Sequence, residues 1–271
     1  MTKSNTRNQP PSNRQLLILL GMFVGFIVGV IWLVSWLVDS LVLLIPPSVE
    51  QQLGALVVPV YEQGSVPTPA QVTLNQLLNR LEANLPPQQK QRDYQVLYIP
   101  ESTVNALAIP GDRIIIYSGL IKQMESENEL MMILGHELGH FANRDHLRSL
   151  GRELLLQVAI ASLIGDVGWI QSVASGITAL SKAQYSQSQE YQADEFGLAL
   201  LQQTYGHVTG ATDFFARLSQ QKSVDLAFLA THPASGKRVA ELQRLQQSQH
   251  YRTGERSPLP KTLANSVRDR G

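Results

Sequence analysis

The sequence HELGH at residues 136–140 brings together three side chains that could build a catalytic metal site. Residues four positions apart on an α-helix project from one face, so the imidazoles of His136 and His140 can bind one Zn²⁺ at about 2.0 to 2.1 Å. Glu137 is offset from His136 by about 100° around the helix, so it stands beside the metal without binding it. There its carboxylate can accept a proton from water. The spacing therefore predicts a zinc-dependent hydrolase with Glu137 as general base.

Two histidines leave such a site one ligand short, and a second helical segment could supply it. Residues 185–201 have a helical pattern in which Glu190 and Asp194 lie one turn apart on one face. An acidic pair at this spacing usually lies on the solvent-exposed face of a helix. Here the preceding HELGH motif favours a role at the metal site instead, because that site needs a third ligand. We expect Glu190 to be the third zinc ligand, and Asp194 to accept the free N–H of a ligating imidazole and fix its tautomer.

His146 is the alternative third ligand, because it lies ten residues after His136, where a third histidine falls in the pattern HExxHxxGxxH. Asn143 occupies the glycine position of that pattern, and asparagine tolerates the left-handed turn required there. That architecture also uses a methionine turn downstream of the motif. The five methionines of this chain lie at positions 1, 22, 124, 131 and 132, all before it. Glu190 is therefore the better prediction.

A long helix must carry the HELGH residues. Ser126 and Glu129 have the spacing of a capping box, and apolar residues after them form a buried stripe. Upstream, the segments 94–99 and 113–117 are rich in β-branched and aromatic residues and are bounded by Pro and Gly, which predicts strands of a small sheet. Most of the remaining pattern is helical, so the expected fold class is α+β, mainly helical.

The segment 16–38 contains only uncharged residues and predicts a transmembrane helix. At 1.5 Å per residue it is about 34 Å long, which is enough to cross a bilayer core of about 30 Å. Lys3, Arg7 and Arg14 precede it, whereas the first basic residue after it is Arg80. The positive-inside rule then predicts a cytoplasmic N-terminus and an extracytoplasmic domain. The apolar run is longer than that of a cleaved signal peptide, which favours an uncleaved anchor.

Two further apolar features concern the membrane. Gly21, Gly25 and Gly29 recur every fourth residue, a spacing that lets two membrane helices approach closely, so a homodimer through this face is a hypothesis. In the segment 154–180, Asp166 separates two uncharged pieces that are each too short to span a bilayer. We interpret this segment as a buried helical scaffold or as a surface lying on the membrane.

Composition excludes several classes of function. Lys and Arg total 22 and Asp and Glu total 22, so the chain has no broad basic charge for a nucleic-acid partner. It has no cysteine, which excludes disulfides, thiolate metal sites and cysteine nucleophiles. It also lacks GxSxG and GxxxxGK patterns, so no motif indicates a serine hydrolase or a nucleotide-binding protein. Any catalytic metal must therefore be held by histidines and carboxylates.

Three motifs in order, HELGHFANRDH, EYQAD and a Thr231-His232-Pro233 sequence followed by Arg238, resemble the zinc metallopeptidase family forty-eight. That family includes the protease HtpX, the CAAX prenyl proteases and the BepA-type periplasmic proteases. The resemblance covers about residues 70–250. It implies a zincin-like gluzincin domain with one Zn²⁺, ligands His136, His140 and Glu190, and Glu137 as general base.

The resemblance also implies how a polypeptide substrate would bind. It suggests that the strand at 113–117, with Ile114 and Ile115, pairs with an extended peptide, and that Asn105 contacts the peptide backbone. Arg238 is a further candidate for substrate binding, with helix capping or an ion pair as the alternatives. His232 could donate to the oxyanion of a tetrahedral intermediate or cap the zinc in a resting form.

These observations predict the following organisation: residues 1–15 cytoplasmic, 16–38 transmembrane, 39–69 a linker, 70–251 the metallopeptidase domain and 252–271 a flexible tail. The predicted function is a membrane-anchored zinc endopeptidase that cleaves unfolded or membrane-associated proteins in protein quality control, the substrate class coming from the resemblance. The alternative is a membrane-tethered chaperone-like or binding module in which four protein ligands close a structural zinc site.

Overall fold

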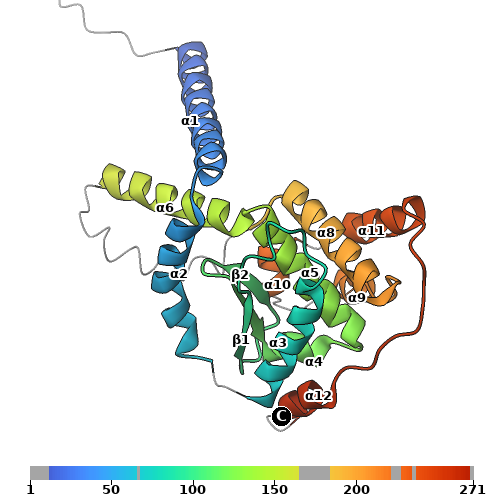
Figure 1. The fold of residues 1–271 in the computed structure, drawn as a ribbon. Helices are drawn as coiled ribbons and strands as arrows, with labels where there is room; N and C mark the ends of the chain where they lie inside the picture. Colours follow the sequence, from blue (N-terminus) through green and yellow to red (C-terminus); the bar gives the residue numbers. More distant parts are fainter. Residues whose placement is uncertain (1–11, 66–67, 165–183, 221–226, 234–235, 269–271) are drawn as a thin grey trace, which may run out of the picture.

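A computed structural model of the chain describes residues 12–65, 68–164, 184–220, 227–233 and 236–268. The described part is mainly helical with one small sheet, as the sequence predicts (Figure 1). The strands are β1 (Gln95–Ile99), β2 (Ala106–Ile109) and β3 (Arg113–Tyr117). The helices are α1 (Asn13–Val42), α2 (Pro47–Glu62), α3 (Pro69–Glu82), α4 (Ser118–Gln123), α5 (Glu127–Ala142), α6 (Asp145–Ile164), α8 (Gln187–Tyr205), α9 (Asp213–Gln220), α10 (Ala227–Thr231), α11 (Gly236–Ser248) and α12 (Lys261–Arg268).

The order of strands in the sheet is β1-β3-β2, so β3 lies in the centre. β1 runs parallel to β3, and β2 runs antiparallel to it, with Ile115 opposite both Leu97 and Leu107. Ile114 and Ile115 are completely buried. The expectation that the strand 113–117 pairs with substrate is therefore wrong, because both of its sides already carry a strand. β1 and β2 form the two edges of the sheet, and the outer edge of β1 already donates hydrogen bonds to side chains of α3, Asn75 and Gln71.

Helices cover both faces of this sheet. Val57 and Tyr61 of α2 pack on one face against the strand residues Leu97 and Ile115. The opposite face belongs to the main core, where α3 and α5 pack on it. The segment 39–69, predicted to be a linker, instead completes α1, forms α2 and begins α3. This arrangement explains the three consecutive isoleucines of β3, because the middle of a strand buried on both faces has no polar side.

The segment 252–271, predicted to be a flexible tail, contains helix α12. Leu263 of this helix is completely buried in the main core, where α12 lies beside α3 and α4 (Figure 1). The chain before it is also held in place, because the backbone of Ser257 hydrogen-bonds the side chain of Asn128 and the backbone of Glu127 at the start of α5. The few apolar residues among many charges hid this helix from the sequence pattern.

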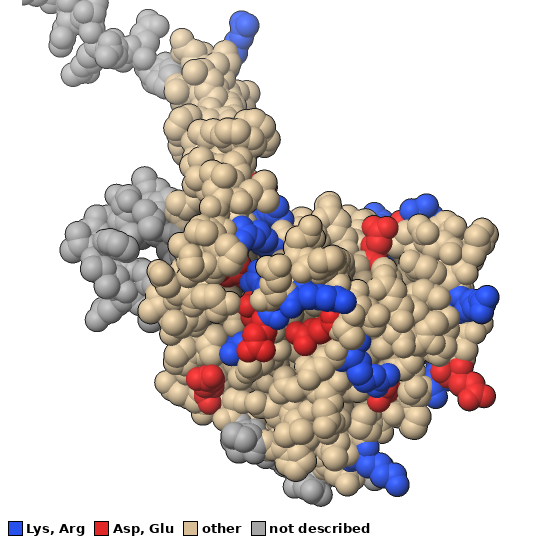
Figure 2. All heavy atoms as spheres, viewed as in Figure 1, with Lys and Arg blue, Asp and Glu red and all other residues tan. Residues whose placement is uncertain are grey.

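α1 projects from the rest of the molecule as a single shaft (Figure 1). Apolar side chains such as Leu17, Met22 and Phe26 are 68%, 69% and 70% exposed. Figure 2 shows almost no charged atoms along the shaft until it meets the body of the protein. Within the described residues, α1 is the one helix long and apolar enough to cross a membrane.

Helix α2 is fastened to the domain by a buried ionic cluster around Glu50. The Glu50 carboxylate is fully buried, accepts a hydrogen bond from His146 Nε2 at 2.9 Å and pairs with Arg92, which also binds Asp112. Burial alone would raise the pKa of Glu50, but the hydrogen bond from His146 and the pairing with Arg92 outweigh it and lower the pKa to about 2. His146 is thus engaged with α2 and does not join the metal-ligand candidates.

We expect Glu50→Gln to make the free energy of unfolding depend less on pH under acidic conditions. A carboxylate with a depressed pKa stabilises the fold above its unfolded-state value of 4.5, and this contribution disappears as the pH falls from there towards 2. Urea unfolding of the full chain in detergent at a series of pH values should show a smaller pH slope in this window for the variant. At pH 7 the free energy of unfolding should fall by about 1 to 3 kcal/mol. Glu62→Gln, an exposed change on the same helix, should leave the slope intact.

Candidate metal centre

The close approach of α5 and α8 brings the predicted ligands together. A Cβ atom at Gly139 would lie 2.7 Å from Cα of Ala193, and one at Gly197 would lie 2.9 Å from the backbone nitrogen of His136. Real Cβ atoms do not come so close, so larger residues would push the two helices apart. This seam of small residues allows the histidines of α5 to face the acidic residues of α8.

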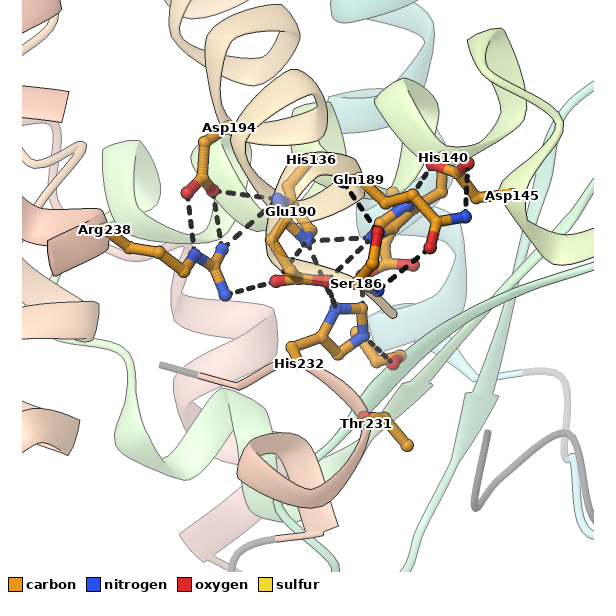
Figure 3. Close-up of polar contacts among 12 residues, drawn as sticks. His136, His140, Asp145, Ser186, Gln189, Glu190, Asp194, Thr231, His232 and Arg238 are labelled. Atoms are coloured by element: carbon orange, nitrogen blue, oxygen red, sulfur yellow. Dashed lines mark hydrogen bonds and ion pairs between the residues drawn. The ribbon is translucent and has the colours of Figure 1, made fainter. Parts of the chain in front are cut away.

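Four side chains converge on one point, His136 and His140 from α5, Glu190 from α8 and His232 just after α10 (Figure 3). One ligand atom from each lies within 4.8 Å of all the others, and all four residues are completely buried. Nε2 of His136 is 3.1 Å from Nε2 of His140 and 3.2 Å from Nδ1 of His232. Oε1 of Glu190 is 3.4 Å from Nε2 of His140 and 3.1 Å from Nδ1 of His232.

These separations fit a tetrahedral metal site. Ligand atoms at about 2.0 to 2.1 Å from a tetrahedral ion are about 3.3 Å from one another, which matches the observed spacings. Both oxygens of Glu137 are buried and have no hydrogen-bond partner among the described residues, although Nε2 of His232 lies 3.6 Å from Oε1. Burying a carboxylate without a hydrogen-bond donor costs free energy, so a carboxylate in this position indicates that a further group binds beside it. The residues therefore fit a divalent cation, with the Glu137 carboxylate beside it.

Asp194 lies where the sequence predicted, with Oδ1 2.9 Å from Nδ1 of His136. Arg238, predicted to contact substrate, is only 1% exposed and binds both oxygens of Asp194, at 2.7 Å from Nε and 2.6 Å from Nη2. Its third nitrogen pairs with Glu190 (Figure 3). The proposed substrate role of Arg238 is therefore wrong for this structure, and the ion-pair alternative is correct.

Arg238 supplies the positive charge that two buried carboxylates need. Burial acts to raise the pKa of Asp194, but the Arg238 guanidinium and the hydrogen bond with His136 hold it below its usual range. Burial likewise opposes the charged form of Glu190, yet His232, Arg238 and His136 keep its pKa well below the ordinary value. Both carboxylates are thus anionic, as a metal ligand and its supporting group must be.

Asp145 is a residue of the site that sequence reasoning missed. Its Oδ2 is 3.0 Å from Nδ1 of His140, and its Oδ1 accepts a hydrogen bond from Nε2 of Gln189 at 2.7 Å. Burial alone would lower the pKa of His140, but Asp145 and Glu190 raise it to about 9. A cation must displace that proton to bind, so metal affinity should increase with pH up to this value. An acidic residue five positions after His140 was the available sequence signal.

The ring of Tyr185 was also missed. It stacks on His140 with ring centroids 3.8 Å apart, and its backbone N–H donates to the carbonyl of Thr231 at 3.1 Å. Burial raises the pKa of Tyr185 well above its ordinary value, so its hydroxyl stays protonated. Tyr185 therefore links the His140 ring to the chain segment that carries His232. No short motif around Tyr185 signals this stacking.

We expect Asp145→Asn to weaken metal binding by about 10- to 100-fold, the usual cost of removing a hydrogen-bond partner from a ligating histidine. The change keeps the size of the side chain but removes the charge that orients His140. Titration of the full chain with a competing chelator measures the affinity. Asp213→Asn is the matched control. Asp213 forms a partly exposed ion pair with Arg256 and is not part of the ligand cluster, so this variant should bind metal as wild type does. Equal affinities in both variants would contradict an orienting role for Asp145.

Asn105 is buried just before β2. Its Oδ1 accepts hydrogen bonds from the backbone of Ala106 at 2.9 Å and from Oγ1 of Thr231 at 3.3 Å. The bond from Thr231 ties the residue just before β2 to the His232 segment, and the predicted contact of Asn105 with a peptide backbone stays a prediction. β2 is the sheet edge beside the cluster, since the carbonyl of Ala106 lies 3.4 Å from Nε2 of His232.

The match to known sequences covers the part of the chain that builds this centre. A family model described as Peptidase family M48 matches residues 70–246, about two thirds of the chain. The chain belongs to peptidase family M48. The M48 match ends within α11 and includes all four converging residues, whereas α1 and α2 precede it.

Several curated M48 relatives are similar to this chain. Metalloprotease LoiP of Escherichia coli is 33% identical over 147 residues, 51% of this chain and 57% of LoiP. A putative beta-barrel assembly-enhancing protease of Vibrio cholerae is 29% identical over 53% of this chain and 32% of its own length. Mitochondrial metalloendopeptidase OMA1 of Arabidopsis thaliana is 27% identical over 54% of this chain and 30% of its own length. The chain therefore spans between about a third and just over half of these relatives.

Proposed function

We propose that the chain is a membrane-anchored zinc endopeptidase. The observation that carries this proposal is the convergence of His136, His140 and Glu190 beside the buried carboxylate of Glu137, which has no hydrogen-bond partner in the described part of the chain. A donor set of imidazoles and one carboxylate is typical of catalytic zinc. The relatives named above as a metalloprotease and a metalloendopeptidase support the same activity.

The protein residues divide the hydrolysis between them. Zinc, when bound, would lower the pKa of its water towards about 7 and polarise the scissile carbonyl. Glu137 takes a proton from water as the water oxygen attacks the carbonyl carbon, and delivers that proton to the amine nitrogen as the C–N bond breaks. Asp194 and Asp145 hold the two imidazoles of α5 in the orientation and tautomer that metal binding requires.

We propose that the substrate is an extended polypeptide that adds to the sheet beside β2. This replaces the predicted pairing with β3, and it rests on the position of Ala106, whose carbonyl borders the ligand cluster. Strand addition uses main-chain hydrogen bonds, so it selects chains that are locally unfolded rather than a particular sequence. Unfolded or membrane-associated proteins, and thus protein quality control, are the substrate class and role that this binding mode favours.

We propose that α1 is the membrane anchor, with a cytoplasmic N-terminus and an extracytoplasmic peptidase domain. The exposed apolar surface of α1 and the basic residues that precede it support this arrangement. A homodimer through Gly21, Gly25 and Gly29 also belongs to this proposal. No described atom lies within 4 Å of the Cβ position of any of the three, so this face of α1 is open to a second helix.

The proposed activity is tested by casein cleavage with the full chain in detergent. We expect turnover to disappear after treatment with a chelator and to return when Zn²⁺ is added, because the scissile carbonyl would otherwise lack its electrophile. Metal analysis of the active protein should give one zinc ion per chain. Cleavage that continues unchanged in the chelator-treated, metal-free protein would refute a metallopeptidase.

The alternative function, a binding module with a closed zinc site, is favoured by one observation. Nδ1 of His232 lies in the ligand cluster, so four protein ligands could surround the ion and leave no position for water. We propose that His232 instead caps the metal in a resting form of the enzyme and must move away for catalysis. A permanently closed site would turn over nothing.

His232→Ala separates these possibilities. If His232 caps the metal, the variant should keep its zinc and cleave casein at a rate within tenfold of wild type or faster, because the fourth position is then open. If His232 stabilises the oxyanion, the rate should fall by about 10²- to 10³-fold with zinc retained. His250→Ala, an exposed change, is the control for general effects. A protein inactive both before and after this change, with zinc bound, would favour the binding module.

A further inference from the structure

An apolar groove lies at the foot of α1, where α1, α2 and α6 meet. Its volume is about 330 Å³, and every side chain that lines it is apolar. The lining residues come from the end of α1 and the chain just after it, from α2, and from the first half of α6. They include Val38, Leu41, Ile45, Leu53, Leu147 and Leu155.

The groove is continuous with the exposed apolar surface of α1. Leu41 lines the groove and is 50% exposed, and the neighbouring Leu37 and Leu44 are 42% and 77% exposed. The predicted membrane span ends at residue 38, so with α1 as the proposed anchor the groove would open at the boundary between the bilayer core and its headgroup layer. At that depth acyl chains rather than water would surround it.

Charged side chains stand beside the groove at the same level. Arg152 lies 2.8 Å and Arg148 lies 3.5 Å from Asp39 at the end of the predicted span, and all three are partly exposed. Figure 2 shows charged atoms gathered where the shaft of α1 meets the body. Arginines at this depth suit the phosphate groups of membrane lipids, while their stems cover apolar surface.

The groove is held open by fixed backbone. Arg144 donates hydrogen bonds to the carbonyls of Val42 at 2.6 Å and Ile45 at 2.8 Å, which ties the end of α1 to the start of α6. Arg144 has a positive φ of 58°, a conformation that a non-glycine residue adopts only when its surroundings impose it. The three walls are therefore positioned by the fold itself.

We infer that the groove binds one acyl chain of a membrane phospholipid, with the lipid phosphate at Arg152. The inference rests on the proposed anchoring by α1. The wholly apolar lining of the groove and its continuity with the exposed apolar surface of α1 favour an acyl chain as the occupant. A bound lipid would fix α6 along the membrane surface and set the height of the metal centre above it.

Site-directed spin labels test lipid contact in the full chain. The protein has no cysteine, so a single introduced cysteine gives one label. The labels are placed at Leu155→Cys in the groove, Phe26→Cys on α1 and Val72→Cys on the exposed side of α3. In vesicles of dioleoylphosphatidylcholine and dioleoylphosphatidylglycerol, collisions with oxygen report lipid and collisions with a nickel chelate report water.

We expect the labels at 155 and 26 to favour oxygen and the label at 72 to favour nickel. A label at 155 that favours nickel while the label at 26 favours oxygen would overturn the lipid site and leave the anchor standing. A label at 26 that favours nickel would refute the anchor as well. Casein turnover of each labelled protein shows that it is folded.

Lipid retention gives a second, independent readout. Native mass spectrometry of the detergent-solubilised full chain should show one phospholipid bound per chain after purification from these vesicles. Leu41→Trp fills the groove from its open side, and Leu44→Trp places the same ring nearby but outside it. We expect retention to fall at least tenfold in the first variant and to stay unchanged in the second. Equal retention in both, or a groove occupied by a second copy or by residues 165–183, would overturn the inference.

Discussion

Replacing Glu137 by glutamine should lower the kcat for casein cleavage by about 10²- to 10⁴-fold, the range that general acid–base catalysis contributes. Glutamine has almost the same shape but cannot accept the proton that the attacking water must lose. The metal-binding residues are untouched, so the zinc content should stay at the wild-type value. Steady-state kinetics and metal analysis of the same preparation measure the two effects separately.

The matched control is Glu127→Gln, the same change on the same helix. Glu127 lies in the first turn of α5 and forms an ion pair with Arg80, away from the ligand cluster. Its activity should remain within a fewfold of wild type. Equal activity of Glu137→Gln and wild type, with zinc bound in both, would show that another group accepts the proton. A simultaneous loss of zinc would instead indicate that Glu137 has a structural role.

Replacing Arg238 by methionine should destabilise the fold by about 3 to 5 kcal/mol, the usual cost of removing one partner from a buried ion pair. The guanidinium is 1% exposed and faces the carboxylates of Asp194 and Glu190. Without it, two buried negative charges face each other near the metal centre. Urea unfolding of the metal-free full chain in detergent measures this loss without a contribution from metal binding.

Arg244→Met on the same helix is the matched control. Arg244 forms an exposed ion pair with Glu241, and such pairs contribute little to stability. Its unfolding curve should therefore lie close to that of wild type. Arg238→Lys should recover only part of the lost stability, because a lysine ammonium cannot bind both carboxylates with the planar geometry of a guanidinium. If the two methionine variants were equally stable, the buried ion pairs of Arg238 would not support the centre.

Helical periodicity within single segments was enough to identify the candidate metal ligands and the candidate general base. The spacing of His136, Glu137 and His140 depends only on the 3.6-residue turn of one helix, and so does the spacing of Glu190 and Asp194 on another. The assignment of residues 16–38 as a possible membrane span likewise follows from composition and length alone. These features were predictable because each is a property of a single segment.

The arrangement between segments was not predictable in this way. β3 has the sequence of a good strand whether it lies at an edge or in the centre, and only its pairing with β1 and β2 excludes it from substrate binding. The residues of α2 were predicted to be a linker because the sheet face that they cover is formed by strands about 40 or more residues later, and no local pattern indicates that contact. Arg238 was predicted to bind substrate, with helix capping or an ion pair as the alternatives, and its partners could not be identified from the sequence because they lie on α8.

The sequence by itself thus determined which side chains could bind a metal and activate water, and which segment could cross a membrane. The tertiary structure decided that His232 joins the cluster, that Asp145 orients His140, and that β2 is the strand beside the site. The physical reason is that helical periodicity sets the direction of side chains within one element. Contacts between elements depend instead on strand order and on the small residues that let α5 and α8 pack closely.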